Sequence, residues 1–320
     1  MLRWRGFEQI PEDWGRCVLS IGVFDGVHLG HQVLVGRLVE RAKELGLPSV
    51  VMTFDPHPSE VIRPGSHPAS LSTLRRRADL RAELGVDVFL VVPFDPRVAA
   101  IPAGEFVHDH LVDELHVAHV LVGENFRFGR RGAGDVDVLR SLGRRFGFTA
   151  EEIALVGPDG VDRSGSHEGF TVSSTYVRAL VDAGDMRAAA KALGRWHRLD
   201  GVVVHGEGRG GSVLGYPTAN LDVAPHGAVP ADGIYAGWFL LGTRRSPAAI
   251  SVGSNPTFDG TRRTVEAFVL DGGANFYGRR VALEFVERLR GQIRYDAVEP
   301  LIEQIGKDVE QTREILDREG

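Results

Sequence analysis

Apolar residues in the first half of the chain follow two patterns, which alternate along the sequence. Short unbroken apolar runs are typical of strands buried on both faces of a parallel sheet, and apolar residues at every third or fourth position are typical of amphipathic helices. The runs predict strands at residues 18–21, 47–54, 86–93, 119–122 and 148–155. The periodic segments predict helices that begin at residue 28 and cover 74–84, 105–115, 138–146 and two pieces of 181–193. This alternation predicts an α/β domain around a parallel sheet.

The second half of the chain changes to the strand pattern, with short runs separated by Gly, Pro and Asp. Strands are predicted at residues 196–205, 236–241, 248–252, 264–270 and 280–285. No long helical segment separates them, which favours an antiparallel barrel over a second parallel sheet. One amphipathic helix, residues 297–316, closes the chain. We place the domain boundary near residue 186, which gives domains 1–186 and 187–320.

Composition limits the function classes. At 320 residues the chain is long enough for two domains, and its 43% hydrophobic and 25% charged residues argue against disorder. A net charge of −6 gives no overall attraction to nucleic acid. The single cysteine, Cys17, excludes an intramolecular disulfide and fits a reducing cytoplasm. No apolar run reaches membrane-spanning length and the first residues are charged where a signal peptide is apolar, so we expect a cytoplasmic protein.

The basic residues are almost all arginine. The only lysines are Lys43, Lys191 and Lys307, and none of them follows a glycine-rich loop. Any phosphate chemistry must therefore rest on histidine, arginine, helix ends and metal. The triplet 75–77, three arginines in a predicted helix, is interpreted as a solvated helix face.

Residues 20–32, SIGVFDGVHLGHQ, join a predicted strand to a predicted helix through a turn with two glycines. This arrangement presents backbone N–H groups and the positive end of the helix to a phosphate. His28 and His31 are three residues apart, so they face the same side of the first helical turn. Either histidine alone is more often a surface or core residue, and a metal pair would lack a third ligand grouped with them. The combined pattern favours an anion site.

Three further stretches of the first half carry candidate chemistry. Residues 53–58, TFDPHP, form a proline-stiffened loop after a strand, where parallel sheets bind ligands. Residues 123–135, GENFRFGRRGAGD, combine aromatics and arginines that can stack on a planar ring and contact phosphates. In 172–178, VSSTYVR, a Ser/Thr helix cap is followed one turn later by Arg178, which could face the same anion. Taken alone, residues 53–58 are better explained as a rigid turn, and a helix cap explains residues 173–175 but not Arg178. The composition of residues 123–135 fits a surface loop equally well, and their position directly after a strand favours the functional interpretation.

The barrel half contains two candidate segments. Residues 206–221, GEGRGGSVLGYPTANL, could bring the backbone close to a phosphate or form a glycine-rich hairpin loop. Alternation along an extended segment places Thr218 and Asn220 on one face, and their neutral oxygen atoms suit a Mg²⁺ ion that already carries phosphate charge. Glu266 lies between apolar residues of a predicted strand, where a glutamate can simply face solvent.

These motifs carry a resemblance to one family. HLGH (28–31), GENFRFG (123–129) and SSTYVR (173–178) resemble, in order and spacing, the FMN adenylyltransferase (FAD synthetase) domain of bacterial bifunctional flavin enzymes. PTAN (217–220) and RTVE (263–266) resemble the signatures of riboflavin kinases. The resemblance implies a Rossmann-like nucleotidylyltransferase domain over 1–186 and a β-barrel kinase domain with a closing helix over 187–320. It implies two reactions, ATP with riboflavin to FMN and ADP, and ATP with FMN to FAD and pyrophosphate.

The resemblance also implies roles for particular residues. Charge stabilisation during adenylyl transfer is assigned to His28, His31 and Arg178. The kinase base is Glu266, and the Mg²⁺ ligands are Thr218 and Asn220. ATP and phosphate binding is assigned to Gly22, Phe24, Asp25, Gly26, Gly30, Ser174, Thr175, Gly206, Arg209, Gly210 and Gly215. Flavin binding is assigned to Phe54, Pro56, Pro58, Asn125, Phe126, Phe128, Tyr277 and Arg290.

The implied partners are the small molecules ATP, riboflavin and FMN, with neither nucleic acid nor membrane; a homo-oligomer is compatible with the sequence. Two other classes of protein share part of the pattern. One is a single-activity enzyme whose other half has become a flavin-binding or regulatory module. The other is a nucleotidyltransferase for a pantetheine- or nicotinate-type acceptor, fused to an interaction barrel. A nucleic-acid-binding barrel is weaker, because the basic pairs 262–263 and 279–280 are short.

Overall fold

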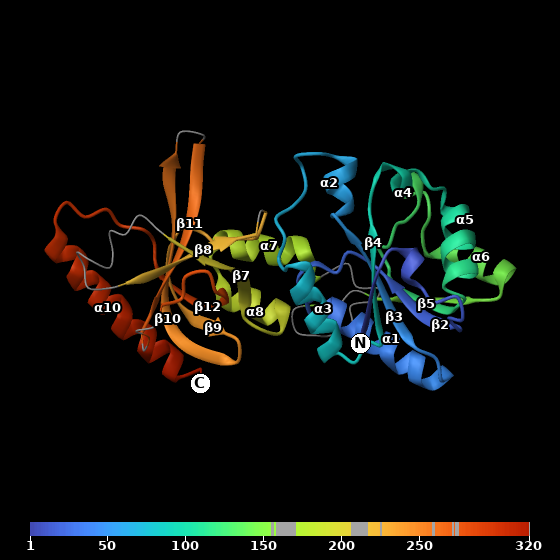
Figure 1. Ribbon diagram of the computed structural model, residues 1–320, viewed down its shortest axis with the longest axis horizontal. Coiled ribbons are helices and arrows are strands. Elements are labelled where there is room, and N and C mark those ends of the chain that lie inside the picture. Colours follow the sequence, from blue (N-terminus) through green and yellow to red (C-terminus); the bar gives the residue numbers. More distant parts are fainter. Residues whose placement is uncertain are drawn as a thin grey trace. The chain divides into compact units, whose positions relative to one another are not determined.

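The computed structural model describes residues 1–320 except 155–156, 158–170, 206–216, 225, 258–259, 271, 273–274 and 320. The chain divides into two compact units. The first contains Met1–Pro68 and Leu74–Ser174, and the second contains Ala69–Thr73 and Thr175–Gly320. Figure 1 shows that the two units have different architectures, a sheet covered by helices and a barrel.

The first unit is built on a six-stranded parallel sheet with the strand order β1-β4-β3-β2-β5-β6. The strands are β1 (Leu2–Arg5), β2 (Cys17–Ile21), β3 (Ser49–Asp55), β4 (Val88–Pro93), β5 (Val117–Gly123) and β6 (Thr149–Ile153). The helical elements are η1 (Phe7–Gln9), η2 (Asp25–Val27), α1 (Leu29–Leu45), α2 (Pro58–Ile62), α3 (Leu74–Glu83), α4 (Pro96–Ala100), α5 (Ala103–Glu105), the π-helical η3 (Phe106–Glu114), η4 (Arg130–Gly132) and α6 (Val136–Phe146). The predicted α/β class of this half is confirmed.

The core of the first unit lies on both faces of the sheet. On one face, Leu38 of α1, Ala78 of α3 and Phe89 of β4 belong to one hydrophobic cluster. On the other face, Leu111 of η3 and Leu139 of α6 belong to the cluster that covers the sheet. Each of the strands β2, β3 and β4 has five consecutive buried residues, which explains why the sequence shows unbroken apolar runs.

Two features of this unit were not predicted. The edge strand β1 is too short and too polar to give an apolar run, and it pairs with β4. One of the two prolines in residues 53–58 takes part in regular structure, because Pro58 is the first residue of α2. Proline is well suited to that position because the first turn of a helix does not need its N–H group. Pro56 is exposed and lies between β3 and α2.

The second unit is a closed antiparallel barrel with the strand order β10-β11-β8-β7-β12-β9. Its strands are β7 (His197–Val204), β8 (Thr218–Val223), β9 (Gly233–Leu241), β10 (Arg244–Thr257), β11 (Gly260–Val269) and β12 (Arg280–Arg290). Its helices are α7 (Ser174–Ala183), which begins at the last residue of the first unit, α8 (Met186–Leu193) and α10 (Val298–Asp317). The predicted barrel with a closing helix is confirmed, and Figure 1 shows α10 alongside the barrel strands.

Helices α7 and α8 are attached to the barrel. The carbonyl oxygen of Val181 accepts a hydrogen bond from Ala231 N–H at 3.3 Å. Arg187 forms ion pairs with Glu287 at 2.6 Å and with Glu319 at 2.9 Å. Residues 175–186 therefore belong to the second compact unit by packing, and the functional boundary near residue 186 stays a prediction.

Candidate active sites

The first candidate site lies at the point where the sheet order reverses. Starting from β2, the chain adds β3 and β4 on one side, and it adds β5 and β6 on the other. Ligands of open α/β sheets bind at such a switch point, beyond the carboxyl ends of the strands. The predicted phosphate turn, residues 22–27, follows β2, and the glycine- and aromatic-rich loop, residues 123–135, follows β5. The two most informative stretches of the first half thus flank the switch point.

The turn after β2 has an unusual backbone. Phe24, Gly26 and Val27 all have positive φ, at 52°, 77° and 42°. Only glycine adopts this conformation at no cost, and a β-branched residue such as valine is rare there. Such a backbone persists only where the surrounding structure holds it, and residues of this kind are concentrated at functional sites.

Side chains from two elements hold the turn by the carbonyl oxygen of Val23. That oxygen accepts a hydrogen bond from Thr53 Oγ1 of β3 at 3.0 Å and one from Arg77 Nη1 of α3 at 3.4 Å. Arg77 is only 9% exposed, so the interpretation of residues 75–77 as a solvated face is wrong for Arg77. The side chain of Arg77 points inward from α3, and its guanidinium donates to the carbonyl oxygen of Val23.

Two more carbonyl oxygens of the turn are bound by side chains. The carbonyl oxygen of Asp25 accepts from Ser174 Oγ at 2.9 Å, and that of Val27 accepts from Gln32 Nε2 at 2.9 Å. Carbonyl oxygens would repel a phosphate, whereas backbone N–H groups and helix N-termini attract it. Side-chain donors of the protein therefore occupy the carbonyl oxygens of the turn that would repel a phosphate.

The two histidines lie together at the start of α1. His28, 5% exposed, is the N-cap residue, and its Nδ1 accepts the backbone N–H of His31 at 3.4 Å. The imidazole rings stack with centroids 3.7 Å apart and planes 21° apart. A Cβ atom on Gly30 would lie 3.3 Å from the His28 ring, which is a tight contact. Phe24 meets the His31 ring edge-on at 5.2 Å.

The candidate flavin residues of the first unit occupy different environments. Phe128 is 8% exposed and lies in the hydrophobic core, and the half-buried Phe126 stacks on it at 5.5 Å. Phe54 is half-buried and meets the ring of Phe94 edge-on at 5.4 Å, whereas Asn125 is exposed. Phe126, Phe54 and Asn125 retain surface for a ligand, while the ring of Phe128 supports that of Phe126.

Some candidate residues of adenylyl transfer and phosphate binding belong to the second unit or lie outside the described residues. Thr175 and Arg178 belong to α7, in the second unit, where Arg178 Nε donates to the carbonyl oxygen of Ala69 at 2.6 Å. Their roles in phosphate binding stay predictions. Four candidates lie outside the described residues: Gly206, Arg209, Gly210 and Gly215.

The second candidate site lies on β8 and β11 of the barrel. Asn220 is directly opposite Glu266, and Thr218 is opposite Phe268. Thr218 Oγ1 donates a hydrogen bond to Glu266 Oε2 at 3.0 Å. The intervening residue Ala219 is buried, as alternation along a strand requires. The structure thus brings Thr218, Asn220 and Glu266 to one face of the barrel wall.

A pocket of about 260 Å³ adjoins this face. Tyr277, at its rim, is 46% exposed and stacks on His205 with ring centroids 3.9 Å apart. His205 was not among the predicted site residues, although a histidine directly before a glycine-rich segment was a usable signal. The lining residues are Val203, Pro217, Thr218, Ala219, Ala267, Val269, Gly272, Asn275, Phe276 and Tyr277.

Arg290, a flavin candidate, joins β12 to α10. Its Nε and Nη2 donate to the two carboxylate oxygens of Asp308 at 3.0 and 2.7 Å. This hydrogen bonding raises the pKa of Arg290 above its ordinary value. The side chains are 17% and 6% exposed, so the pair is largely withdrawn from water. The contacts show a clamp for the closing helix, and contact of Arg290 with flavin stays a prediction.

We expect Asp308→Asn to destabilise the barrel by about 3 kcal/mol, because it leaves a largely buried arginine without its counter-charge. The measurement is the urea concentration at the midpoint of the barrel's unfolding transition. Asp317→Asn, at an exposed position of the same helix, is the matched control and should not change that concentration. An unchanged midpoint for Asp308→Asn would contradict the clamp.

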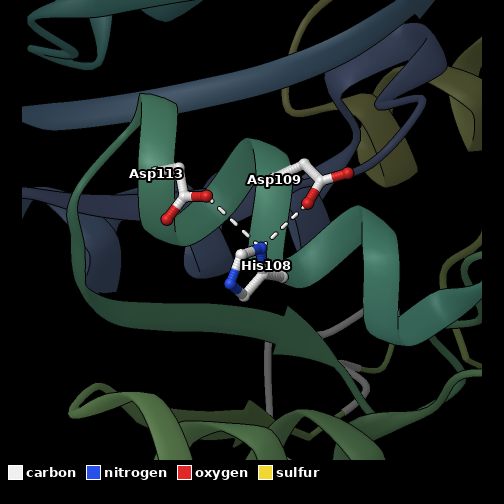
Figure 2. A group of neighbouring side chains, drawn as sticks. All are labelled: His108, Asp109 and Asp113. Carbon is white, nitrogen blue, oxygen red and sulfur yellow. Dashed lines mark hydrogen bonds and ion pairs between the residues drawn. The ribbon is translucent and has the colours of Figure 1, made fainter.

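A third group of side chains lies on η3 (Figure 2). His108 Nδ1 is 2.9 Å from an Asp109 carboxylate oxygen and 3.3 Å from one of Asp113. Among the described residues, this is the group of acidic residues and histidine that could hold a metal ion. All three side chains are more than half exposed and already satisfy one another, so we assign them only to the stability of η3.

Comparisons with known proteins find one enzyme family in each half of the chain. A family model described as FAD synthetase matches residues 10–167, and one described as riboflavin kinase matches residues 193–316. Proteins named bifunctional riboflavin kinase/FMN adenylyltransferase are similar over most of the chain. The one from Pseudomonas fluorescens is 38% identical over 97% of this chain and 96% of its own length, and the one from Escherichia coli K12 is 36% identical over 96% and 95%.

A solved structure supports the same fold. The crystal structure of a protein named macrolide-efflux protein, from Streptococcus pneumoniae, is 28% identical, with a TM-score of 0.85 over 98% of this chain and 99% of that one. In the described part of this chain, no helix combines the length and apolar character needed to cross a membrane. With both halves matched by family models and relatives above 30% identity along nearly its whole length, the chain belongs to the bifunctional riboflavin kinase/FMN adenylyltransferase family.

Proposed function

We propose that the two activities of this enzyme use the two separate sites described above. The first site, on residues 1–186, transfers the adenylyl group of ATP to FMN. The second, on residues 187–320, phosphorylates riboflavin. The observation that carries the assignment is that each unit contains a group of neighbouring candidate side chains: the stacked histidines on α1, and the Glu266–Thr218–Asn220 face of the barrel.

In adenylyl transfer, the phosphate of FMN attacks the α-phosphorus of ATP and pyrophosphate leaves. The attacking phosphate is already an anion, so the site needs no base and must instead stabilise the charge of the transition state. The turn 22–27, the N-terminus of α1 and the imidazoles of His28 and His31 supply that stabilisation. Fixed N–H groups and a helix dipole do so without reorganising as the charge moves.

In the kinase reaction, the 5′-hydroxyl of riboflavin attacks the γ-phosphorus of ATP. We assign Glu266 as the group that accepts the hydroxyl proton, because its carboxylate lies directly opposite Asn220 and accepts a hydrogen bond from Thr218. The hydrogen bond from Thr218 at 3.0 Å fixes the orientation of that carboxylate. The wall of the adjoining pocket supplies apolar surface for a ring.

The donor set on β8 fits Mg²⁺. The hydroxyl oxygen of Thr218 and the amide oxygen of Asn220 are hard, neutral ligands on one face of a rigid strand, and they add no charge to the phosphates already present. Thr218 and Asn220 would hold the ion, which when bound neutralises negative charge on ATP.

We expect Thr218→Val to raise the Mg²⁺ concentration needed for half-maximal riboflavin kinase activity by at least about tenfold. Loss of a residue that only supports a metal ligand already lowers metal affinity by about that factor. Valine keeps the shape of threonine and removes the hydroxyl, and with it both the ligand oxygen and the hydrogen bond to Glu266. The Mg²⁺ dependence, and not the maximal rate, is therefore the readout. The measurement is a Mg²⁺ titration of both activities in the same preparation. Thr264→Val, on the neighbouring strand, is the control. An unchanged titration for Thr218→Val would remove Thr218 from the metal site.

We also propose that the enzyme works in the cytoplasm on small molecules, without a nucleic-acid or membrane partner. The net charge of −6 supports this view. The single thiol supports it too: burial raises the pKa of Cys17 to about 12, so the thiol is inert, and a disulfide within the chain is excluded.

The test is a time course of the purified protein with riboflavin, ATP and Mg²⁺, with the flavins separated by chromatography. FMN followed by FAD is the expected order. FMN alone would mean that the first site takes another acceptor. If riboflavin is unchanged but added FMN is converted to FAD, the barrel is a flavin-binding or regulatory module instead of a kinase.

A further inference from the structure

Arg81, on α3, is the largest fully buried side chain of the described residues, with 0% exposure. Its Nη1 donates to the carbonyl oxygen of Arg77 at 2.5 Å, one turn earlier in the helix. Its Nε and Nη2 have no hydrogen-bond partner among the described residues. A buried cation without an ion pair is costly, and arginine is rarely found buried in this way. Packing alone would be served equally well by an apolar side chain.

The guanidinium of Arg81 lies between two aromatic rings. Its central carbon is 5.1 Å from the ring centroid of Phe24 and 4.8 Å from that of Phe89. A cation over the face of an aromatic ring is attracted to it, and the attraction is larger when the cation is withdrawn from water. Phe89 belongs to the rigid strand β4, whereas Phe24 belongs to the strained turn after β2. Arg81 thus links the turn to the sheet.

The ring held by Arg81 is the ring that His31 contacts. Phe24 has φ 52°, is 3% exposed, and meets the His31 imidazole edge-on at 5.2 Å. His31 in turn stacks on His28 at 3.7 Å. Movement of the Phe24 ring would therefore change the orientation of both imidazoles and the backbone of the phosphate turn.

Burial and two nearby charged side chains act on the pKa of Arg81. Burial lowers the pKa of Arg81 to about 9; the nearby charge of Arg77 adds to this effect and that of Asp25 opposes it. Asp25, 3% exposed, belongs to the same turn as Phe24. The fold thus keeps the buried guanidinium of Arg81 next to the turn, although burying a charge is unfavourable.

We propose that Arg81 is a positioning residue for adenylyl transfer: its buried guanidinium, between Phe24 and Phe89, fixes the Phe24 ring and through it the orientation of His31. This inference rests on the proposed role of the two histidines. Under this proposal Arg81 lowers the stability of the fold and raises the rate of FAD formation, a combination that a purely structural residue does not have.

The test compares Arg81→Met, which keeps length and removes charge, with Arg81→Lys, which keeps the charge. We expect Arg81→Met to lower kcat for FAD formation about tenfold, with the KM for ATP changed less than about twofold, because the loss is one of orientation in the transition state. The melting temperature should be equal to or above that of the parent protein, and riboflavin kinase activity should not change. Arg81→Lys should recover most of the kcat.

Arg75→Met, at an exposed position of the same helix, is the matched control. FAD formation within twofold of the parent for Arg81→Met would overturn the proposal. A lowered melting temperature with equal losses for both variants would also overturn it, because packing alone would then explain the residue. If the parent protein itself forms no FAD from FMN, the proposed function of the first site fails, and that failure is distinct from failure of the inference.

Discussion

Replacing Glu266 by glutamine is expected to lower the rate of riboflavin phosphorylation by about 10³-fold, the usual contribution of a positioned general base. Glutamine has nearly the shape of glutamate and can still accept the hydrogen bond from Thr218, which is 3.0 Å away. It cannot accept the proton of the riboflavin hydroxyl. The loss should therefore appear in kcat, with little change in the KM for riboflavin, because the proton moves only in the transition state. The measurement is steady-state FMN formation.

The same variant should still convert added FMN to FAD at the parent rate, because Glu266 belongs to the barrel and the stacked histidines belong to the first unit. Glu284→Gln is the matched control, since Glu284 is also a glutamate on a barrel strand and its ion pair with Arg245, at 3.5 Å, is long. Loss of both activities in a folded Glu266→Gln protein would contradict the two-site assignment. Kinase activity close to that of the parent would remove Glu266 as the base.

Much of the architecture follows from local pattern. Parallel strands buried on both faces must be apolar throughout, so the runs that became β2, β3 and β4 were visible without any tertiary information. The change to short strands without intervening helices likewise predicted the barrel. The edge strand β1 was missed because an edge strand packs on fewer neighbours and need not be apolar.

The arrangement of the candidate residues could be predicted where they lie within one short segment. The spacing of His28 and His31 is a property of a single helical turn, and that of Thr218 and Asn220 is a property of one strand. The partnership of Thr218 with Glu266 depends on the register of β8 against β11, which only the barrel provides. The stack of His205 on Tyr277 depends on barrel closure in the same way.

Arginines that point inward were the least predictable residues of the site. Helical spacing places Arg77 and Arg81 on the same face of α3 as Ala78, which is buried. A pattern that counts every arginine as polar assigns that face to solvent. The partners that make burial acceptable, the carbonyl oxygen of Val23 and the ring of Phe24, lie some fifty residues earlier in the chain. Only the folded structure brings them together.

Aromatic composition also could not distinguish a ring that binds a ligand from one that fills the core. Phe126 and Phe128 are two residues apart in a loop, and the sequence gives both the same role. In the fold, Phe128 pairs its backbone with Gly134 and its ring lies in the core, beneath Phe126. The glycine is required there, because a Cβ atom at residue 134 would lie 2.5 Å from the Phe128 ring.

The second large effect is expected at the stacked histidines. His28→Asn with His31→Ala should lower FAD formation by about 10³-fold, comparable to removal of a preorganised donor from an anion-stabilising site. Asparagine at residue 28 can still accept the backbone N–H that the Nδ1 of His28 accepts now, so the N-cap of α1 is kept and only the imidazole is lost. FMN should therefore accumulate from riboflavin at the parent rate. Chromatography of the flavins formed with time measures both effects.

Because the two rings stack at 3.7 Å, they should act as a unit, and the double variant should lose little more than the worse of the two single variants. His116→Asn is the matched control: His116 lies at the opposite, amino end of β5, and asparagine tolerates its positive φ of 48°. Independent, multiplying losses would mean that each histidine contacts a different part of the substrate. Unchanged FAD formation would remove both from the reaction, and a parallel collapse of FMN formation in a folded protein would contradict separate sites.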